Sequence, residues 1–352
     1  MGGALDEMTQ PDNVYDLNRA DSAIGRVDPL FPIYRTMERY EVRCSASEFH
    51  EAVNIAFHAA EAPVYDLIHR EMWETIPEQV ALLAADCIGV LSSKKLKLLD
   101  VGCGTGLSTH LLLQTALGQY IQDAYLIDTS TAMLERARKR AAGWSIGKKF
   151  AACRIEALPR MPAYDVVVIC SVLHHIPDLS KFLQEIQCRM NPESILIHLQ
   201  DPNGDYLKDP DLQSRIHALK TYHLPAWEKL RWRVQKASAG RLTARVRKML
   251  TPGYDYIART NAILLADKVI SKPMLPDDIW SVTDIHVHDD RGVSIRELRE
   301  LLPGCTLLSL RSYSFFGAMK SEIPPKFASL EQMLIRQNAP NGSHVAGAWR
   351  KK

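Results

Sequence analysis

The sequence predicts an α/β protein built on an open, mostly parallel β-sheet with helices on both faces. Between about residues 96 and 201, short apolar segments alternate with amphipathic helical segments at the spacing of βαβ units. Residues 164–170 are almost wholly apolar and rich in valine, which is typical of a strand buried on both faces. With 352 residues, the chain is long enough for one large α/β domain with additions.

The composition is that of an ordinary globular protein. Apolar residues make up 46% of the chain and the formal net charge is +2, which argues against a partner that is uniformly polyanionic. The seven cysteines are scattered and form no C-x-x-C pair, so we expect reduced thiols, no structural metal and a cytoplasmic protein. We find no membrane-spanning run or signal peptide, and the composition does not determine the oligomeric state.

A glycine-rich turn follows the first predicted strand. Residues 97–101 form a short apolar strand, Gly102, Gly104 and Gly106 follow at alternate positions, and a helix is expected from about Ser108. A strand, a glycine turn and a helix N-terminus together present backbone N–H groups to a ligand. This stretch therefore predicts a binding site for a polar ligand group, although a glycine turn also serves strand-to-helix packing.

Three helices are expected before this strand. Apolar residues recur at helical spacing over 45–60, where Ser47 is a candidate cap, and on the next segment over 64–76. Pro77 is expected to end the second helix, and a third then covers 78–90.

The remaining strands of this region follow the glycine turn. They are expected at 124–127, ending at Asp128, then at 150–155, 164–170 and 194–199. In an open parallel sheet, ligands bind beyond the carboxyl ends of the strands. Several polar segments fall at that edge: residues 102–106, Asp128, Glu156 and residues 170–175.

The sheet pattern is interrupted between about residues 206 and 291. This insertion is helical, aromatic and locally basic, with a charge run over 229–236 that is either a solvated helix face or a binding site for an anionic group. The sheet then resumes with a helix capped by Ser294, strands over 306–314 and 345–350, and a helix over 330–336 between them. We therefore expect four segments: an N-terminal arm and helical cap segment (1–92), a ligand-binding core (93–205), a helical lid (206–291) and the rest of the sheet (292–352).

With these pieces in order, the chain resembles the class I S-adenosylmethionine (SAM) methyltransferases. The resemblance covers roughly 95–205 and 292–352, and it is carried by residues 98–106, Asp128, 164–167 and 173–178 in register. It implies a Rossmann-like, seven-stranded and mostly parallel sheet that binds SAM. In that family the glycine loop passes beneath the methionine and ribose parts of SAM, and the acid that ends strand two accepts hydrogen bonds from both ribose hydroxyls.

The resemblance also implies a set of cofactor-binding residues. One position departs from the family: Arg154 stands where an acid often meets the adenine amino group, so we carry over the Ile155 backbone and keep Glu156 only as a candidate. Tyr65, in the segment before the core, is either a ligand of the SAM carboxylate or a half-buried helix aromatic. The predicted SAM-binding residues are Tyr65, Asp100, Gly102, Cys103, Gly104, Gly106, Asp128, Thr129, Ile155, Glu156 and Cys170.

Three histidines are candidates for catalysis. His174 and His175 follow strand four at the mouth of the expected site, and His286 shares one face of an extended segment with His288. A neutral imidazole can take a proton from the acceptor, although such histidines are also common in structural turns. We expect a small-molecule acceptor, anionic or carrier-linked, enclosed by a cap from 45–90 and 206–291. An RNA methyltransferase and a SAM-binding protein without methyltransferase activity are the alternatives, while the glycine spacing disfavours a nicotinamide dehydrogenase.

Overall fold

The computed structural model describes residues 28–91, 95–222, 254–286, 292–318 and 320–352. A seven-stranded sheet forms the centre of the molecule, with the strand order β3-β2-β1-β4-β5-β7-β6. The order reverses between β1 and β4, and β7 is antiparallel to both of its neighbours. The strands are β1 (Leu96–Val101), β2 (Ile121–Asp128), β3 (Gly147–Ala152), β4 (Tyr164–Cys170), β5 (Met190–Pro202), β6 (Cys305–Tyr313) and β7 (His344–Lys351). The predicted fold class is confirmed.

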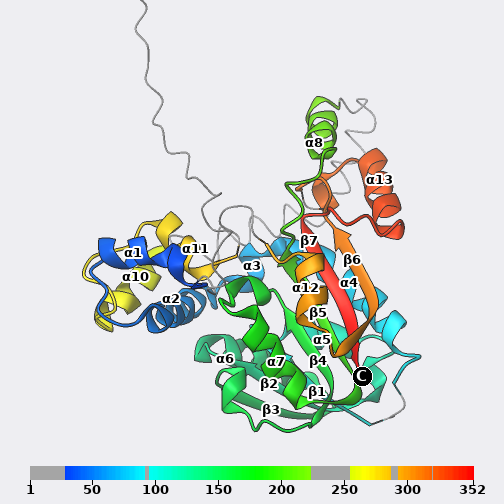
Figure 1. Ribbon diagram of the computed structural model, residues 1–352, viewed down its shortest axis with the longest axis horizontal. Helices are drawn as coiled ribbons and strands as arrows, with labels where there is room; N and C mark the ends of the chain where they lie inside the picture. The colour runs from blue at the N-terminus through cyan, green and yellow to red at the C-terminus, as the bar shows by residue number, and fades with distance from the viewer. Residues whose placement is uncertain (1–27, 92–94, 223–253, 287–291, 319) are drawn as a thin grey trace, which may run out of the picture.

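Helices cover both faces of this sheet (Figure 1). One hydrophobic core joins the sheet to α4 (Arg70–Cys87), α5 (Leu107–Leu113), α6 (Thr131–Arg140) and α13 (Pro325–Arg336). A second core, on the other face, includes α7 (Leu179–Arg189) and α12 (Ile295–Leu301). Strand β4 contributes Val166 and Val168 to the first core and Val167 and Ile169 to the second, because successive side chains of a strand point to opposite faces.

The helical cap has a hydrophobic core of its own. Helices α1 (Tyr34–Arg39) and α2 (Ala46–Glu61) from the N-terminal segment lie beside α10 (Tyr256–Ala266) and α11 (Pro276–Thr283) from the insertion (Figure 1). Phe49 and Val53 of α2 are fully buried against apolar residues of these helices. Two segments that are far apart in the sequence therefore form one lobe beside the carboxyl ends of β1, β2 and β4.

The described helices differ from the sequence-based expectation at several points. Pro77 does not end a helix, because α4 runs through it; only a short helix, α3 (Tyr65–Ile68), precedes α4. Ser45, not Ser47, caps α2, in a capping box with Glu48. Strand β3 begins three residues earlier than expected. Helix α4 packs against the sheet and α8 (Leu212–Thr221) lies near α13, so neither belongs to the lobe of α2, α10 and α11 (Figure 1).

Some predicted features lie outside the described residues. They include the basic run over 229–236, His288 and the first 27 residues. No described helix is long and apolar enough to cross a membrane.

Candidate functional site

The glycine turn after β1 adopts backbone conformations that favour glycine. Gly102, Gly104 and Gly106 have φ values of 66°, 53° and 76°. A Cβ atom on Gly102 would lie 2.5 Å from a methyl group of Val172, whereas a Cβ on Gly104 would meet nothing within 4 Å. The loop is held from below, since the Cys103 N–H donates to the Ile127 carbonyl oxygen at 3.0 Å. Gly104 therefore leaves an open surface above the loop on which a ligand can lie.

Asp128 ends β2 beside this loop and is already oriented by two backbone groups. Its Oδ2 accepts a hydrogen bond from the Gly104 N–H at 2.8 Å, and its Oδ1 accepts from the Ser130 N–H at 2.8 Å. Burial raises the pKa of this carboxyl. Each carboxylate oxygen retains acceptor capacity, so the pair can still receive hydroxyl protons from a ligand.

Asp100 lies beneath the loop and does not line the cavity described below. Its side chain is fully buried, and its Oδ2 accepts hydrogen bonds from Ser108 Oγ at 2.8 Å and Thr109 Oγ1 at 2.5 Å. Burial raises the pKa of Asp100 to about 6. The carboxyl group thus joins the end of β1 to the first turn of α5, and this places it behind the ligand surface.

A polar cluster fixes the segment that precedes α4 onto the glycine loop. Thr105 Oγ1 donates to Asp66 Oδ1 at 2.9 Å, while Arg140 contacts Asp66 Oδ2 at 2.6 Å and the Thr105 carbonyl at 2.8 Å. These contacts hold α3 above the loop and bring Tyr65 to the cavity. The Tyr65 ring packs against His69, with the centroids 4.4 Å apart, and burial raises the pKa of the Tyr65 hydroxyl well above its usual range.

A cavity of about 350 Å³ extends from the glycine loop to the cap. Most of the predicted SAM-binding residues line it: Tyr65, Gly102, Cys103, Gly104, Asp128, Thr129, Ile155, Glu156 and Cys170. Gly106 and Asp100 are the two that do not. Gly106 sits against Ala137 of α6, where a Cβ would come within 3.3 Å of the alanine methyl group. Its function in the structure is therefore close packing of the loop against α6.

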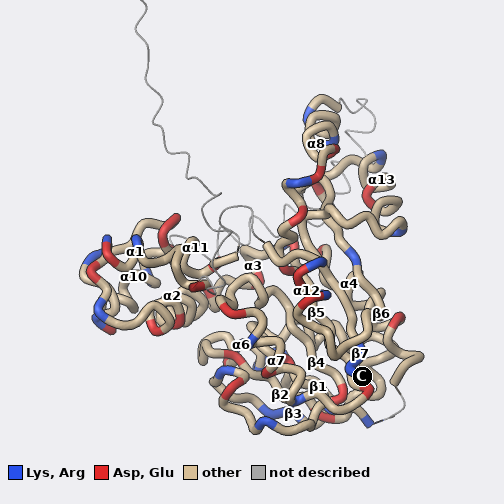
Figure 2. The backbone as a smooth tube through the Cα atoms, in the orientation of Figure 1, with Lys and Arg blue, Asp and Glu red and all other residues tan. Residues whose placement is uncertain are grey.

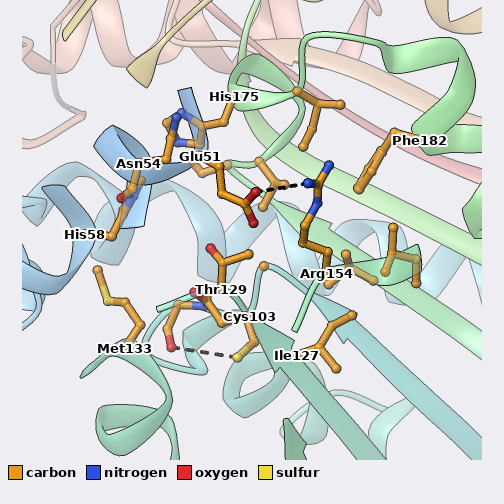
Figure 3. Close-up of a pocket in the computed structure, with 18 of the residues that line it drawn as sticks. Glu51, Asn54, His58, Cys103, Ile127, Thr129, Met133, Arg154, His175 and Phe182 are labelled. Atoms are coloured by element: carbon orange, nitrogen blue, oxygen red, sulfur yellow. Dashed lines mark hydrogen bonds and ion pairs between the residues drawn. The ribbon is translucent and has the colours of Figure 1, made fainter. Parts of the chain in front are cut away.

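The cap side of the cavity is formed by one polar face of α2. This face carries Ser47, His50, Glu51, Asn54 and His58. Glu51 and Arg154 form an ion pair at 3.1 Å that joins the cap to the core across the cavity (Figure 3). Arg154 also lies 3.6 Å from Glu156. The position at which the family often has an acid is thus occupied by an arginine that is paired with acids on both sides.

The three candidate histidines occupy different environments. His174 is buried, and its Nδ1 lies 2.9 Å from Asp201 Oδ1. His286 contacts the Ile176 carbonyl through Nε2, and its backbone N–H donates to the His174 carbonyl. Neither lines the cavity, whereas His175 does. Only His175 of the three is therefore placed where it can touch a ligand in the cavity; His288 lies outside the described residues.

His175 is oriented by the segment that follows α11. Its Nδ1 lies 2.8 Å from the Thr283 carbonyl oxygen and 3.1 Å from Asp284 Oδ1, so this nitrogen carries a proton. Burial acts to lower the pKa of His175, but the hydrogen bond and the charge of Asp284 outweigh it and raise that pKa. The same pairing lowers the pKa of Asp284 despite its burial.

His174 Nε2 is also 3.7 Å from Asp284 Oδ1, and His174, His175 and Asp284 are close enough to consider as metal ligands. The proton on Nδ1 of His175 accounts for the arrangement without an ion.

Some residues of the cavity were not predicted from the sequence. His50, Asn54 and His58 recur at every fourth position of α2 and therefore share one helix face. That polar stripe is a signal that could have identified the cap wall. Asp284 begins the segment that carries His286, and its contact with His175 is set by tertiary packing.

The comparisons with known proteins address the same region. Residues 92–243 match the family model described as a methyltransferase domain. This part of the chain is therefore a methyltransferase domain. The match agrees with the glycine loop, the acid at the end of β2 and the sheet order of the structure.

Several curated relatives are parts of much larger proteins. A highly reducing polyketide synthase of Aspergillus carbonarius is 28% identical over 162 residues, which cover 41% of this chain and 6% of that protein. The lovastatin diketide synthase of Monascus pilosus is 32% identical over 108 residues, covering 29% of this chain and 4% of that protein. The chain therefore spans about one twentieth of the length of these relatives.

Solved methyltransferase structures are also similar to this chain. The plantazolicin methyltransferase BpumL, in complex with SAH, is 14% identical with a TM-score of 0.42, and the match covers 87% of this chain and 98% of that one. DhpI in complex with SAH is 18% identical with a TM-score of 0.37, and the match covers 44% of this chain and 71% of that one.

Proposed function

We propose that this enzyme methylates a small natural-product molecule that is held between the glycine loop and helix α2. The observation that carries the proposal is the cavity: it continues from the loop and Asp128 to the polar face of α2, so donor and acceptor can share one enclosed space. The Glu51–Arg154 ion pair lies across this space (Figure 3). The space that remains is suited to a small molecule.

The residues of this chain have separate roles in the proposal. SAM supplies an activated methyl group on a positively charged sulfur. Asp128 binds the two ribose hydroxyls, the loop from Gly102 to Gly106 supports the methionine and ribose parts, and Ile155 contacts the adenine. Tyr65 contributes a hydroxyl donor at the methionine end. The apolar and backbone surfaces around them exclude water, which favours a displacement in which charge is lost.

The relatives and the residues that line the cavity support the proposed class of acceptor. Several relatives are named as polyketide synthases, which favours an acyl or polyketide-like acceptor. His175 and the polar residues of α2 offer hydrogen bonds to the oxygen atoms of such a molecule. Among the described residues, Lys and Arg are interspersed with Asp and Glu (Figure 2). The net charge of only +2 favours a compact acceptor over a nucleic acid, which binds along basic surfaces.

The first test is binding of the demethylated product, SAH, measured by calorimetry. Asp128→Ala removes an acceptor for two hydroxyl groups, and each hydrogen bond to a charged partner is worth about 1.5–3 kcal/mol. We expect affinity to fall by at least about tenfold. Asp123→Ala, in the exposed part of the same strand, is the matched control and should bind SAH like the wild type.

The second test is turnover. The enzyme is incubated with SAM and a panel consisting of a phenol, a carboxylic acid, a primary amine, a thiol and a 1,3-dicarbonyl compound, and the formation of SAH is followed. SAH released with at least one of these, and lost in Asp128→Ala, supports the proposal. Loss of less than threefold in SAH affinity for Asp128→Ala would contradict the binding site. Methylation of RNA but of none of these compounds would contradict the acceptor class.

A further inference from the structure

His58 of the cap lies in contact with His175 of the core. The two rings meet edge to face, with centroids 5.1 Å apart and an interplanar angle of 83°. Both side chains line the same cavity as the glycine loop and Asp128 (Figure 3). Two imidazoles this close can contact neighbouring atoms of a single acceptor molecule.

Each ring is fixed by a contact at its Nδ1 atom. His58 Nδ1 lies 2.9 Å from the Asn54 carbonyl oxygen, one turn earlier in α2, so Nδ1 carries the proton. His175 Nδ1 donates to Thr283 and Asp284, as described above. Neither Nε2 has a hydrogen-bond partner recorded within the described ranges of the chain. The second nitrogen of each ring is thus the one available to an acceptor.

The surroundings of the two rings favour opposite protonation states. A carboxylate, Asp284, directly contacts His175 and stabilises its imidazolium form. His58 has only a neutral carbonyl at Nδ1, is half-buried, and faces the positive charge of His175. These effects lower the pKa of His58, whereas that of His175 is raised.

Other charged and titratable groups surround the pair. Glu61 of α2 and Asp128 of β2 act on His58 in the direction that favours its protonation, and Asp201 of β5 does the same for His175. His50 of α2 is neutral, since burial lowers its pKa to about 4. Burial of His58 and the charge of His175 outweigh Glu61 and Asp128, so the net effect on His58 is a lowered pKa.

We propose that His58 and His175 form a catalytic pair in which neutral His58 takes a proton from the acceptor and charged His175 donates a hydrogen bond to a second oxygen of the same acceptor. This inference rests on the proposed function. It assigns the base to the cap, whereas the sequence pointed to the histidines after β4. It also implies that the acceptor carries a dissociable proton, as a hydroxyl group does.

The step balances as an acid–base-assisted displacement. The acceptor O–H bond breaks and its proton passes to Nε2 of His58. The oxygen lone pair forms the new O–C bond to the methyl carbon, and the C–S bond breaks with its electron pair remaining on sulfur. The sulfonium charge is lost and the imidazolium of His58 carries the proton until solvent removes it. No oxidant or reductant is required.

The protonation states can be measured without an acceptor. Histidine side-chain resonances of the wild type, assigned with His58→Gln and His175→Gln, are followed through a pH titration by NMR. We expect the pKa of His58 below 6.5, that of His175 above 6.5, and a rise in the pKa of His58 in His175→Gln, because a neighbouring positive charge is removed. Two histidines with the same charge at pH 7 would overturn the assignment.

Kinetics test the catalytic roles with an acceptor from the panel that turns over. General base catalysis typically contributes about 10²- to 10⁴-fold, so His58→Gln should lower kcat by about that factor and remove the rise of kcat/KM on the acidic side. His175→Gln should raise KM and remove the fall on the alkaline side. His110→Gln, a histidine of α5 that does not line the cavity, is the control with unchanged profiles.

The outcomes separate this inference from the proposed function. Suppose that the wild type binds SAH and methylates an acceptor, and that His58→Gln retains both the wild-type kcat and the rise of kcat/KM on the acidic side. The pair is then not catalytic and the proposed function stands. If His58→Gln loses SAH affinity more than threefold, the residue acts on the donor site and the assignment fails. If the wild type methylates none of the panel, the proposed function is in question, and the NMR titration still decides the charges of the two histidines.

Discussion

At the scale of single residues, the site shows how neighbours give the same side chain different properties. Asp100 and Asp128 end adjacent strands, yet one is fully buried against hydroxyl groups and the other meets backbone N–H groups at the cavity. His174 and His175 are adjacent in the chain, but only the second faces the cavity. Residue type alone therefore does not assign a role here.

Asp100 gives a prediction about stability and pH. Its pKa is about 6 in the folded state, against an ordinary value of 3.8, so the folded protein binds this proton more tightly than the unfolded chain. The resulting stabilisation is full below about pH 4 and is lost as the pH rises through about 6. Asp100→Asn lacks this dependence.

The measurement is chemical denaturation of the wild type and Asp100→Asn at pH 4, 5, 6 and 7. The difference between the two free energies of unfolding should shift by roughly 2 kcal/mol in favour of the wild type from pH 7 to pH 4. A difference that stays constant across this range would show that the Asp100 carboxyl group titrates normally.

At the scale of elements, the turn between β1 and α5 meets two structural requirements within a few residues. Its glycines need positive φ values, and the chain on either side must pack tightly. Gly102 and Gly104 share the first requirement, but only Gly102 has a neighbouring side chain in the path of a Cβ atom. The two positions form a matched pair for experiment.

We expect Gly102→Ala to destabilise the protein more than Gly104→Ala. Both variants place an alanine in the left-handed region, which costs about 1–2 kcal/mol. In Gly102→Ala the new Cβ atom also lies 2.5 Å from a methyl carbon of Val172. Overpacking of this kind typically costs about 1–3 kcal/mol more. Thermal and denaturant unfolding without ligand would measure the difference; equal losses would show that Val172 moves aside freely.

At the scale of the whole molecule, two separately packed regions enclose one cavity. The sheet and its helices form one, and α1, α2, α10 and α11 form the other. The Glu51–Arg154 pair and the contact between His58 and His175 join the two across the cavity. Damage to the cap core should therefore affect the cap side of the cavity while the sheet remains folded.

Phe49→Ala tests this division. The ring is fully buried in the cap, and removing a buried phenylalanine costs about 3–5 kcal/mol. By hydrogen exchange, we expect faster exchange in α2, α10 and α11 and unchanged protection in β1, β4 and β5. Phe31→Ala, at a side chain of the same lobe that is 67% exposed, is the control. Loss of protection throughout the sheet would show that cap and core fold as one unit.

The sequence by itself determined the sheet, the glycine loop and Asp128, because these depend on local patterns: apolar runs, turn residues and spacing along the chain. It could not determine how α2 meets the end of α11. His58, His175 and Asp284 are brought together only when the N-terminal segment and the insertion pack into one lobe beside the segment that follows β4. Their charges depend on burial and on each other, so the tertiary structure decided which histidine faces the cavity and how its proton is held.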